Sequence, residues 1–156
     1  MQPSQLIELA RELADARGGN PGQVHLRRAS CTTYYALFHA LSRCCADSLI
    51  GASQADRIGA AWNQVYRSLE HRHAAKQCSS RRISAFPSQI ADFAALFSFL
   101  QEKRHVADYD PLASFAKAPI IADIDEAASV IDAFEAAPPK ARQAFAAFVL
   151  FKSREV

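Results

Sequence analysis

The segment between Pro21 and Gly51 constrains the fold more than any other part of the chain. Proline is favoured in the first turn of a helix and glycine just beyond its end, so this segment predicts one long helix that ends near Leu49. Its apolar side chains form a wide arc on a helical wheel. They are Leu26, Cys31, Tyr34, Leu37, Phe38, Leu41, Cys44 and Cys45. Since a wide apolar arc must be covered by several neighbours, we expect this helix at the centre of the molecule.

The rest of the chain predicts shorter helices joined by short connections, and no segment indicates a strand. Serine N-caps, prolines and an Asp-x-x-Glu capping box set the expected starts. The first expected helix lies between Ser4 and Gly18-Gly19, and the third lies between Ser53 and the polar residues 76–84. The fourth lies between Pro87 and Asp110-Pro111, and the fifth lies between Asp123 and Pro138-Pro139. A last helix bears Phe145, Phe148 and Phe151. We therefore predict an all-α, antiparallel bundle of five to six helices in a single domain, residues 1–156.

The charge balance argues against general binding of duplex nucleic acid. Eighteen basic and sixteen acidic residues give a net charge of only +2, so any anion site must be local. The sequence has no signal-like N-terminus and no apolar stretch near the roughly 20 residues that cross a bilayer, so we expect a cytoplasmic protein without membrane contact. In that compartment cysteines are reduced, and we interpret all four as core thiols. They are Cys31, Cys44, Cys45 and Cys78.

The histidines and cysteines do not form a metal-binding pattern. His71, His73 and Cys78 are close in sequence, but residues two apart on a helix diverge by about 200°, and there is no Cys-x-x-Cys pair. The chain also has no glycine-rich phosphate loop and no nucleophile elbow. We therefore predict neither a metal nor a cofactor.

A polar stripe runs along the otherwise apolar central helix and consists of Arg28, Thr32, Tyr35, His39 and Arg43. One interpretation is an ordinary solvent-facing surface. The other is a cleft or a subunit interface, because tyrosine and histidine favour partial burial and the arginines bring fixed positive charge. The sequence alone leaves both interpretations open.

Three cationic residues, Lys103, Arg104 and His105, end the fourth predicted helix. Cations in a last helical turn are favoured by the helix dipole, which gives these residues a structural interpretation. Arg104 can also form an ion pair with Asp108, four residues later, if the helix continues that far.

Three segments resemble bacterial proteins of the HEPN family (higher eukaryotes and prokaryotes nucleotide-binding). Residues 27–40 resemble the family's Arg-Arg-Ala…Tyr-Tyr-Ala-x-Phe-His helix. Residues 104–111 are similar to the Arg-x-x-Ala-Asp-Tyr segment of one branch, and residues 145–154 are similar to that branch's C-terminal helix. The resemblance implies a HEPN-like helical bundle that forms a homodimer.

The resemblance also implies that the protein acts on RNA or nucleotides. It implies that the protein does so together with a nucleotidyltransferase-type partner protein, or as part of a toxin–antitoxin or defence system. Catalytic members cut RNA without a metal, using an arginine, the polar residue after it and a histidine four to six residues beyond the arginine. The arginine stabilises the charge that forms when a ribose 2′-hydroxyl attacks the adjacent phosphate, and the histidine moves protons near neutral pH.

This chain departs from the family's ribonuclease motif. Arg104 and His105 match it, but Tyr109 stands where the motif has histidine, and a phenol is a poor base at neutral pH. His105, His39 or His71 are the alternatives for proton transfer.

Our leading hypothesis is therefore a metal-independent endoribonuclease, and its rival is a non-catalytic dimeric scaffold that binds a nucleotide, RNA or partner protein. The predicted catalytic residues are Arg104, His105 and Tyr109, and the predicted RNA- or nucleotide-binding residues are Arg28, Tyr35, His39, Arg43 and Asp108.

Overall fold

The computed structural model describes residues 1–154 and confirms an all-α fold, with no strand in that range. The helices in chain order are α1 (Pro3–Ala14), α2 (Ala16–Gly19), α3 (Gln23–Leu49), α4 (Gly59–Tyr66), α5 (His71–Cys78), the 3₁₀ helix η1 (Arg81–Ala85), α6 (Ser88–Tyr109), α7 (Lys117–Glu135) and α8 (Pro139–Leu150). The predicted domain extends to Val156, so its last two residues lie outside the described range.

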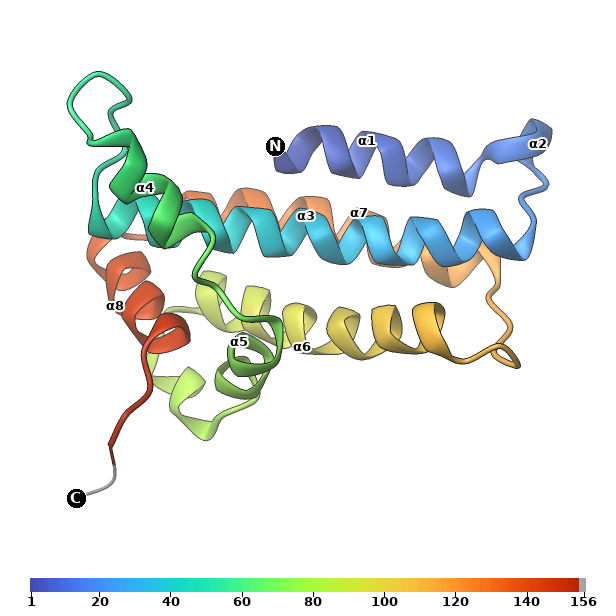
Figure 1. Cartoon of the computed structure of the whole chain (residues 1–156). Helices are drawn as coiled ribbons and strands as arrows, with labels where there is room; N and C mark the ends of the chain where they lie inside the picture. Colours follow the sequence, from blue (N-terminus) through green and yellow to red (C-terminus); the bar gives the residue numbers. More distant parts are fainter. Residues whose placement is uncertain (155–156) are drawn as a thin grey trace.

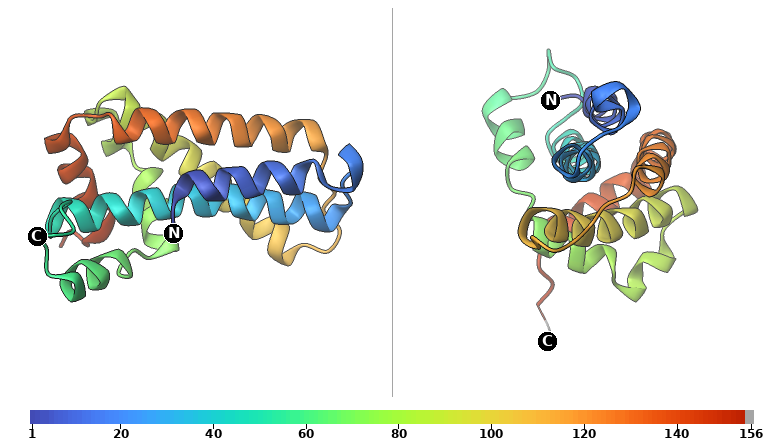
Figure 2. Two further views of the ribbon diagram at one scale, coloured as in Figure 1. Left: turned by 90° about the horizontal axis from the view of Figure 1, so that it is seen from above. Right: turned by 90° about the vertical axis from the view of Figure 1, so that its right-hand side faces the viewer.

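Four long helices, α1, α3, α6 and α7, run side by side as a bundle (Figures 1 and 2). α3 is antiparallel to α1 and to α6, and α7 returns antiparallel to α6. The short α8 crosses one end of the bundle, while α4 and α5 lie on its outside. α3 packs against α1, α4, α6, α7 and α8, which confirms its predicted central position.

Aromatic side chains from three helices fill the core between α6, α7 and α8. Phe93 of α6 stacks on Phe134 of α7 with ring centroids 4.2 Å apart, and both rings meet Phe145 of α8 nearly edge-on. All three are almost completely buried, and burial of each apolar side chain stabilises the fold by about 1.5–3 kcal/mol. The prediction for the four cysteines is also confirmed, since Cys31, Cys44, Cys45 and Cys78 are all free and buried.

The prediction of five to six helices is wrong, because residues 1–154 form eight α-helices. The first expected helix ends at Ala14, and the short α2 that follows does not continue it, because Arg17 and Gly18 within α2 have positive φ angles. The third expected helix is two helices, α4 and α5, because each packs on a different neighbour. α4 lies on α3, where the Trp62 indole donates to Asp47 at 2.9 Å, whereas α5 packs on α6 and α8.

Several predicted helix starts also require correction. α1 begins at Pro3 and not at Ser4, and Ser53 lies in an exposed loop before α4. Part of the expected loop 76–84 is helical, in α5 and η1. Asp123 is not an N-cap but a buried residue within α7, where its carboxylate accepts a hydrogen bond from Lys103 of α6. The capping-box pattern failed here because the same residue types also serve contacts between helices.

Candidate functional site

Arg104 lines a shallow surface pocket of about 380 Å³ between α5 and α6. The residues around this pocket, which we call the Arg104 pocket, are His71, Arg72, Gln101, Arg104, His105 and Tyr109. Two arginines and two histidines are among them, and no carboxylate is. The pocket therefore has the composition of an anion site, although the whole chain is nearly neutral.

The guanidinium of Arg104 is held by contacts on three sides. Its Nε donates to Gln101 Oε1 at 3.2 Å, and its Nη1 donates to Asp108 Oδ2 at 3.3 Å, so the predicted ion pair with Asp108 is confirmed. The guanidinium carbon lies 5.2 Å from the ring centroid of Tyr34 and 5.9 Å from that of Tyr35. Nη2 has no hydrogen-bond partner among residues 1–154. This fixed orientation leaves donors available for a phosphate.

His71 reaches the pocket from α5 and is anchored on α3. Its Nδ1 lies 2.6 Å from the hydroxyl of Tyr34, and its ring stacks on Phe38 with centroids 3.9 Å apart. Burial lowers the pKa of His71, and the positive charge of Arg104 lowers it further. Burial raises the pKa of the Tyr34 hydroxyl. His71 is therefore a neutral imidazole at neutral pH, paired with a protonated phenol.

The predicted catalytic residues are brought together. His105 and Tyr109 both line the Arg104 pocket, one helical turn apart, with ring centroids 4.9 Å from each other. Both side chains are exposed.

Asp108 joins the pocket to the central helix. Its Oδ2 accepts from Arg104, and its Oδ1 accepts from the thiol of Cys31 on α3 at 3.3 Å. Burial, with a further contribution from Asp108, raises the pKa of Cys31 to about 12, so this thiol is protonated and a weak nucleophile. The arrangement makes Asp108 a residue that positions the arginine, because a carboxylate repels a phosphate.

The structure divides the predicted polar stripe of α3. Tyr35 is near Arg104, and Arg28 is exposed on the same helix, close enough to Cys31 for its charge to lower that thiol's pKa. His39 instead turns toward α4, where its Nδ1 lies 2.5 Å from the Tyr66 hydroxyl. Burial lowers the pKa of His39 as well.

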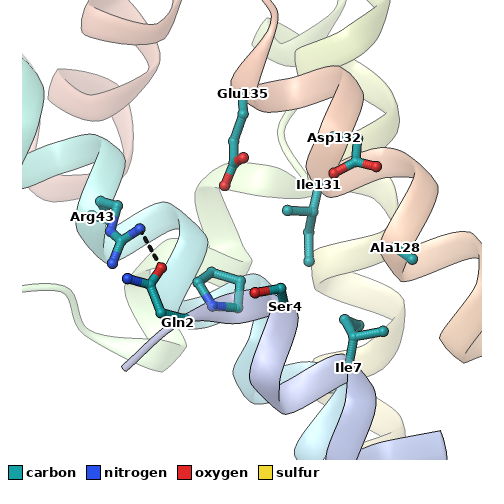
Figure 3. Close-up of a pocket in the computed structure, with 9 residues that line it drawn as sticks. Gln2, Ser4, Ile7, Arg43, Ala128, Ile131, Asp132 and Glu135 are labelled. Carbon is teal, nitrogen blue, oxygen red and sulfur yellow. Dashed lines mark hydrogen bonds between the residues drawn. The ribbon is translucent and has the colours of Figure 1, made fainter.

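Arg43 belongs to a different pocket, of about 280 Å³, between α1, α3 and α7. Figure 3 shows its guanidinium bonded to Gln2, with Glu135 and Asp132 on the facing helix. Along α3 it lies about 12 Å from Tyr35. Because Glu135 and Asp132 also line this pocket, it is a poorer anion site than the Arg104 pocket.

Sequence reasoning assigned no role to Arg72 or Gln101, and it placed Tyr34 only in the apolar arc of the central helix. Gln101 precedes Arg104 by three residues on one helix face, so helical spacing could have identified it. Arg72 and Tyr34 join the site only because α5 and α3 pack beside α6, which no local pattern records.

No group of three or more histidine, cysteine or acidic side chains within residues 1–154 is arranged to hold a metal ion. In the same range, no helix is both long and apolar enough to span a membrane. Comparisons with protein-family models, with curated proteins and with solved structures gave no match.

Proposed function

We propose that the Arg104 pocket binds the phosphate of RNA or of a nucleotide. The observation that carries the proposal is the fixed guanidinium of Arg104 beside Arg72 and two histidines, in a pocket lined by no carboxylate. Arginine donors match the geometry of phosphate oxygens, and the imidazole of His105 adds a further N–H donor. The helical bundle and the similarity of residues 27–40 and 104–111 to HEPN proteins favour the same ligand class.

We further propose metal-independent RNA cleavage, because the pocket holds two imidazoles with different surroundings. In this mechanism Nε2 of neutral His71 accepts the proton of a ribose 2′-hydroxyl, while Nδ1–H donates to the Tyr34 hydroxyl oxygen. The 2′-oxygen attacks phosphorus, and Arg104 stabilises the charge on the phosphoryl oxygens. His105 protonates the departing 5′-oxygen, which leaves a 2′,3′-cyclic phosphate and a 5′-hydroxyl.

The rival proposal, a scaffold that binds without cleaving, rests on Tyr109. This phenol occupies the family's histidine position and lines the pocket, where it can stack on a base or donate to a phosphate but is a poor proton acceptor.

A homodimer is the assembly that we propose, and an exposed apolar surface supports it. Phe99 and Val106 are exposed on α6 and line a hollow with Phe115, while Tyr109 and Leu112 are exposed at and just beyond the C-terminal end of α6. Apolar side chains gathered at one site on a protein surface commonly mark an interface. A nucleotidyltransferase-type partner and a toxin–antitoxin or defence role follow from the family resemblance alone.

Incubation of the purified protein with single-stranded RNA, with chelator present, tests cleavage by the appearance of 2′,3′-cyclic phosphate ends. We expect Arg104→Ala and His71→Ala each to reduce the rate by roughly 10²-fold or more, as for loss of one transition-state donor or one general base. Lys140→Ala, an exposed change on α8, is the control.

Fluorescence anisotropy with the same RNA tests binding separately. Binding that Arg104→Ala weakens, without cleavage, supports the scaffold. Cleavage or binding that is unaffected by Arg104→Ala contradicts the proposed site.

A further inference from the structure

A second cationic pocket, of about 380 Å³, lies beside α5, where η1 and the segment after α8 approach it. Its lining residues are His73, Lys76, Gln77, Arg82, Lys152 and Ser153. Lys76, Arg82 and Lys152 are exposed, and none of them forms an ion pair with another residue in the described range. Among residues 1–154, no carboxylate lines this pocket.

His73 lines this pocket and carries a polar atom that the fold leaves unpaired. Its Nε2 is buried and has no hydrogen-bond partner within residues 1–154. A buried polar nitrogen without a partner is costly, and most such groups in folded proteins are paired.

The two pockets take different residues of α5. His71 and Arg72 contribute to the Arg104 pocket, while His73, Lys76 and Gln77 contribute to the second. Arg72 and Lys76 are four residues apart and so lie on one face of this 8-residue helix, where the two pockets adjoin. α5 itself lies on the outside of the bundle (Figure 1).

We propose that the second pocket binds another phosphate of the same nucleic acid strand, so that the ligand is single-stranded RNA that passes across α5. This inference rests on the proposed function, because it assumes that one phosphate occupies the Arg104 pocket. A single nucleotide fills only one pocket. The nearly neutral chain argues against general binding of a duplex, whereas the flexible backbone of a single strand can follow two adjoining cationic pockets.

Salt dependence of RNA binding gives the decisive test, using Lys76→Ala/Lys152→Ala. For single strands, each lost phosphate contact reduces the slope of log K against log salt by about 0.7, so we expect the double variant, which loses the one phosphate contact of the second pocket, to show a slope smaller by about 0.7. We expect its affinity for an oligouridylate that spans both pockets to fall, while its binding of the dinucleotide UpU, followed by NMR chemical shifts, stays unchanged. The matched control is Arg11→Ala/Lys140→Ala, which removes two exposed cations from α1 and α8.

The outcomes separate the two proposals. If Arg104→Ala weakens both ligands but the Lys76/Lys152 variant keeps the unmodified slope, the second pocket is overturned and the proposed function stands. If the Lys76/Lys152 variant loses UpU as strongly as the oligomer, the two pockets are not independent and the inference also fails. If the unmodified protein binds neither RNA, the proposed function itself is wrong.

Discussion

At the scale of single residues, the hydroxyl of Tyr34 carries a clear energetic prediction. It lies 2.6 Å from His71 Nδ1, and Tyr34 is completely buried. Because Tyr34→Phe leaves the imidazole nitrogen without its partner, we expect the free energy of unfolding to fall by about 1 kcal/mol. Urea denaturation measures this, with Tyr109→Phe as a control, since Tyr109 is 69% exposed. A Tyr34→Phe variant as stable as the unmodified protein would show that this bond contributes nothing.

The pKa values of two partly buried histidines, His39 and His71, predict how stability depends on pH. Burial lowers the folded-state pKa of His39 and of His71 below the ordinary value of 6.5. Between the folded and ordinary values, the unfolded chain binds more protons, so stability rises with pH. We therefore expect full stability above pH 6.5 and a loss as the pH falls through the folded-state values.

Urea midpoints measured between about pH 5.5 and 7.5, above the ordinary range of carboxyl groups, test this dependence. The His39→Gln/His71→Gln variant should be less stable at neutral pH but show a flatter profile than the unmodified protein. Lys140→Gln serves as the control and should keep the unmodified slope. An unchanged slope in the double histidine variant would assign the pH dependence to other groups.

The sequence could predict contacts between residues that are close along the chain, but not contacts between residues that are far apart along it. The Arg104–Asp108 pair follows from i, i+4 spacing, and the structure contains it. The contact of Tyr34 with His71 joins residues 37 positions apart, so no local pattern could select His71 from the three alternatives for proton transfer.

At the scale of elements, one ion pair links α6 to α7. Lys103 Nζ donates to Asp123 Oδ2, and both side chains are largely shielded from solvent. Lys103→Ala leaves the carboxylate buried without its partner, and we expect the free energy of unfolding to fall by about 2 kcal/mol. Thermal and urea denaturation measure the change.

The matched variant removes both charges. Lys103→Met/Asp123→Leu replaces the pair with apolar side chains, which is commonly neutral or stabilising, so it should recover most of the lost stability. If the double variant is as unstable as Lys103→Ala, the effect does not arise from the unpaired carboxylate.

The sequence predicted long elements better than short ones. α3 matches its predicted limits closely, since Pro21 and Gly51 flank it and its wide apolar arc requires burial on several sides. The division between α4 and α5 was missed, because it arises from tertiary contacts such as that of Trp62 with Asp47. α5 supplies two of the six residues that line the Arg104 pocket and three of the six that line the second pocket, so missing this short helix meant missing how the two pockets are built.

At the scale of the whole molecule, the bundle buries its large aromatics but leaves an apolar surface around the end of α6. Phe99 and Val106 line, with Phe115, an apolar hollow of about 450 Å³, and Leu112 beyond them is 91% exposed. A stable dimer buries about 800 Å² on each partner, with apolar side chains concentrated at its centre. We therefore expect a homodimer whose interface includes this surface.

Leu112→Glu tests that interface, because the side chain contacts solvent in the single chain and its replacement should not disturb the fold. We expect the unmodified protein to be a dimer by light scattering and Leu112→Glu to be monomeric at the same concentration, because a dimer would bury the new carboxylate. Ile58→Glu is the control, since Ile58 is 74% exposed but lies at the opposite end of α3, before α4. A monomeric unmodified protein contradicts the dimer, whereas a dimer that persists in Leu112→Glu but not in Ile58→Glu moves the interface to the α4 end of the bundle.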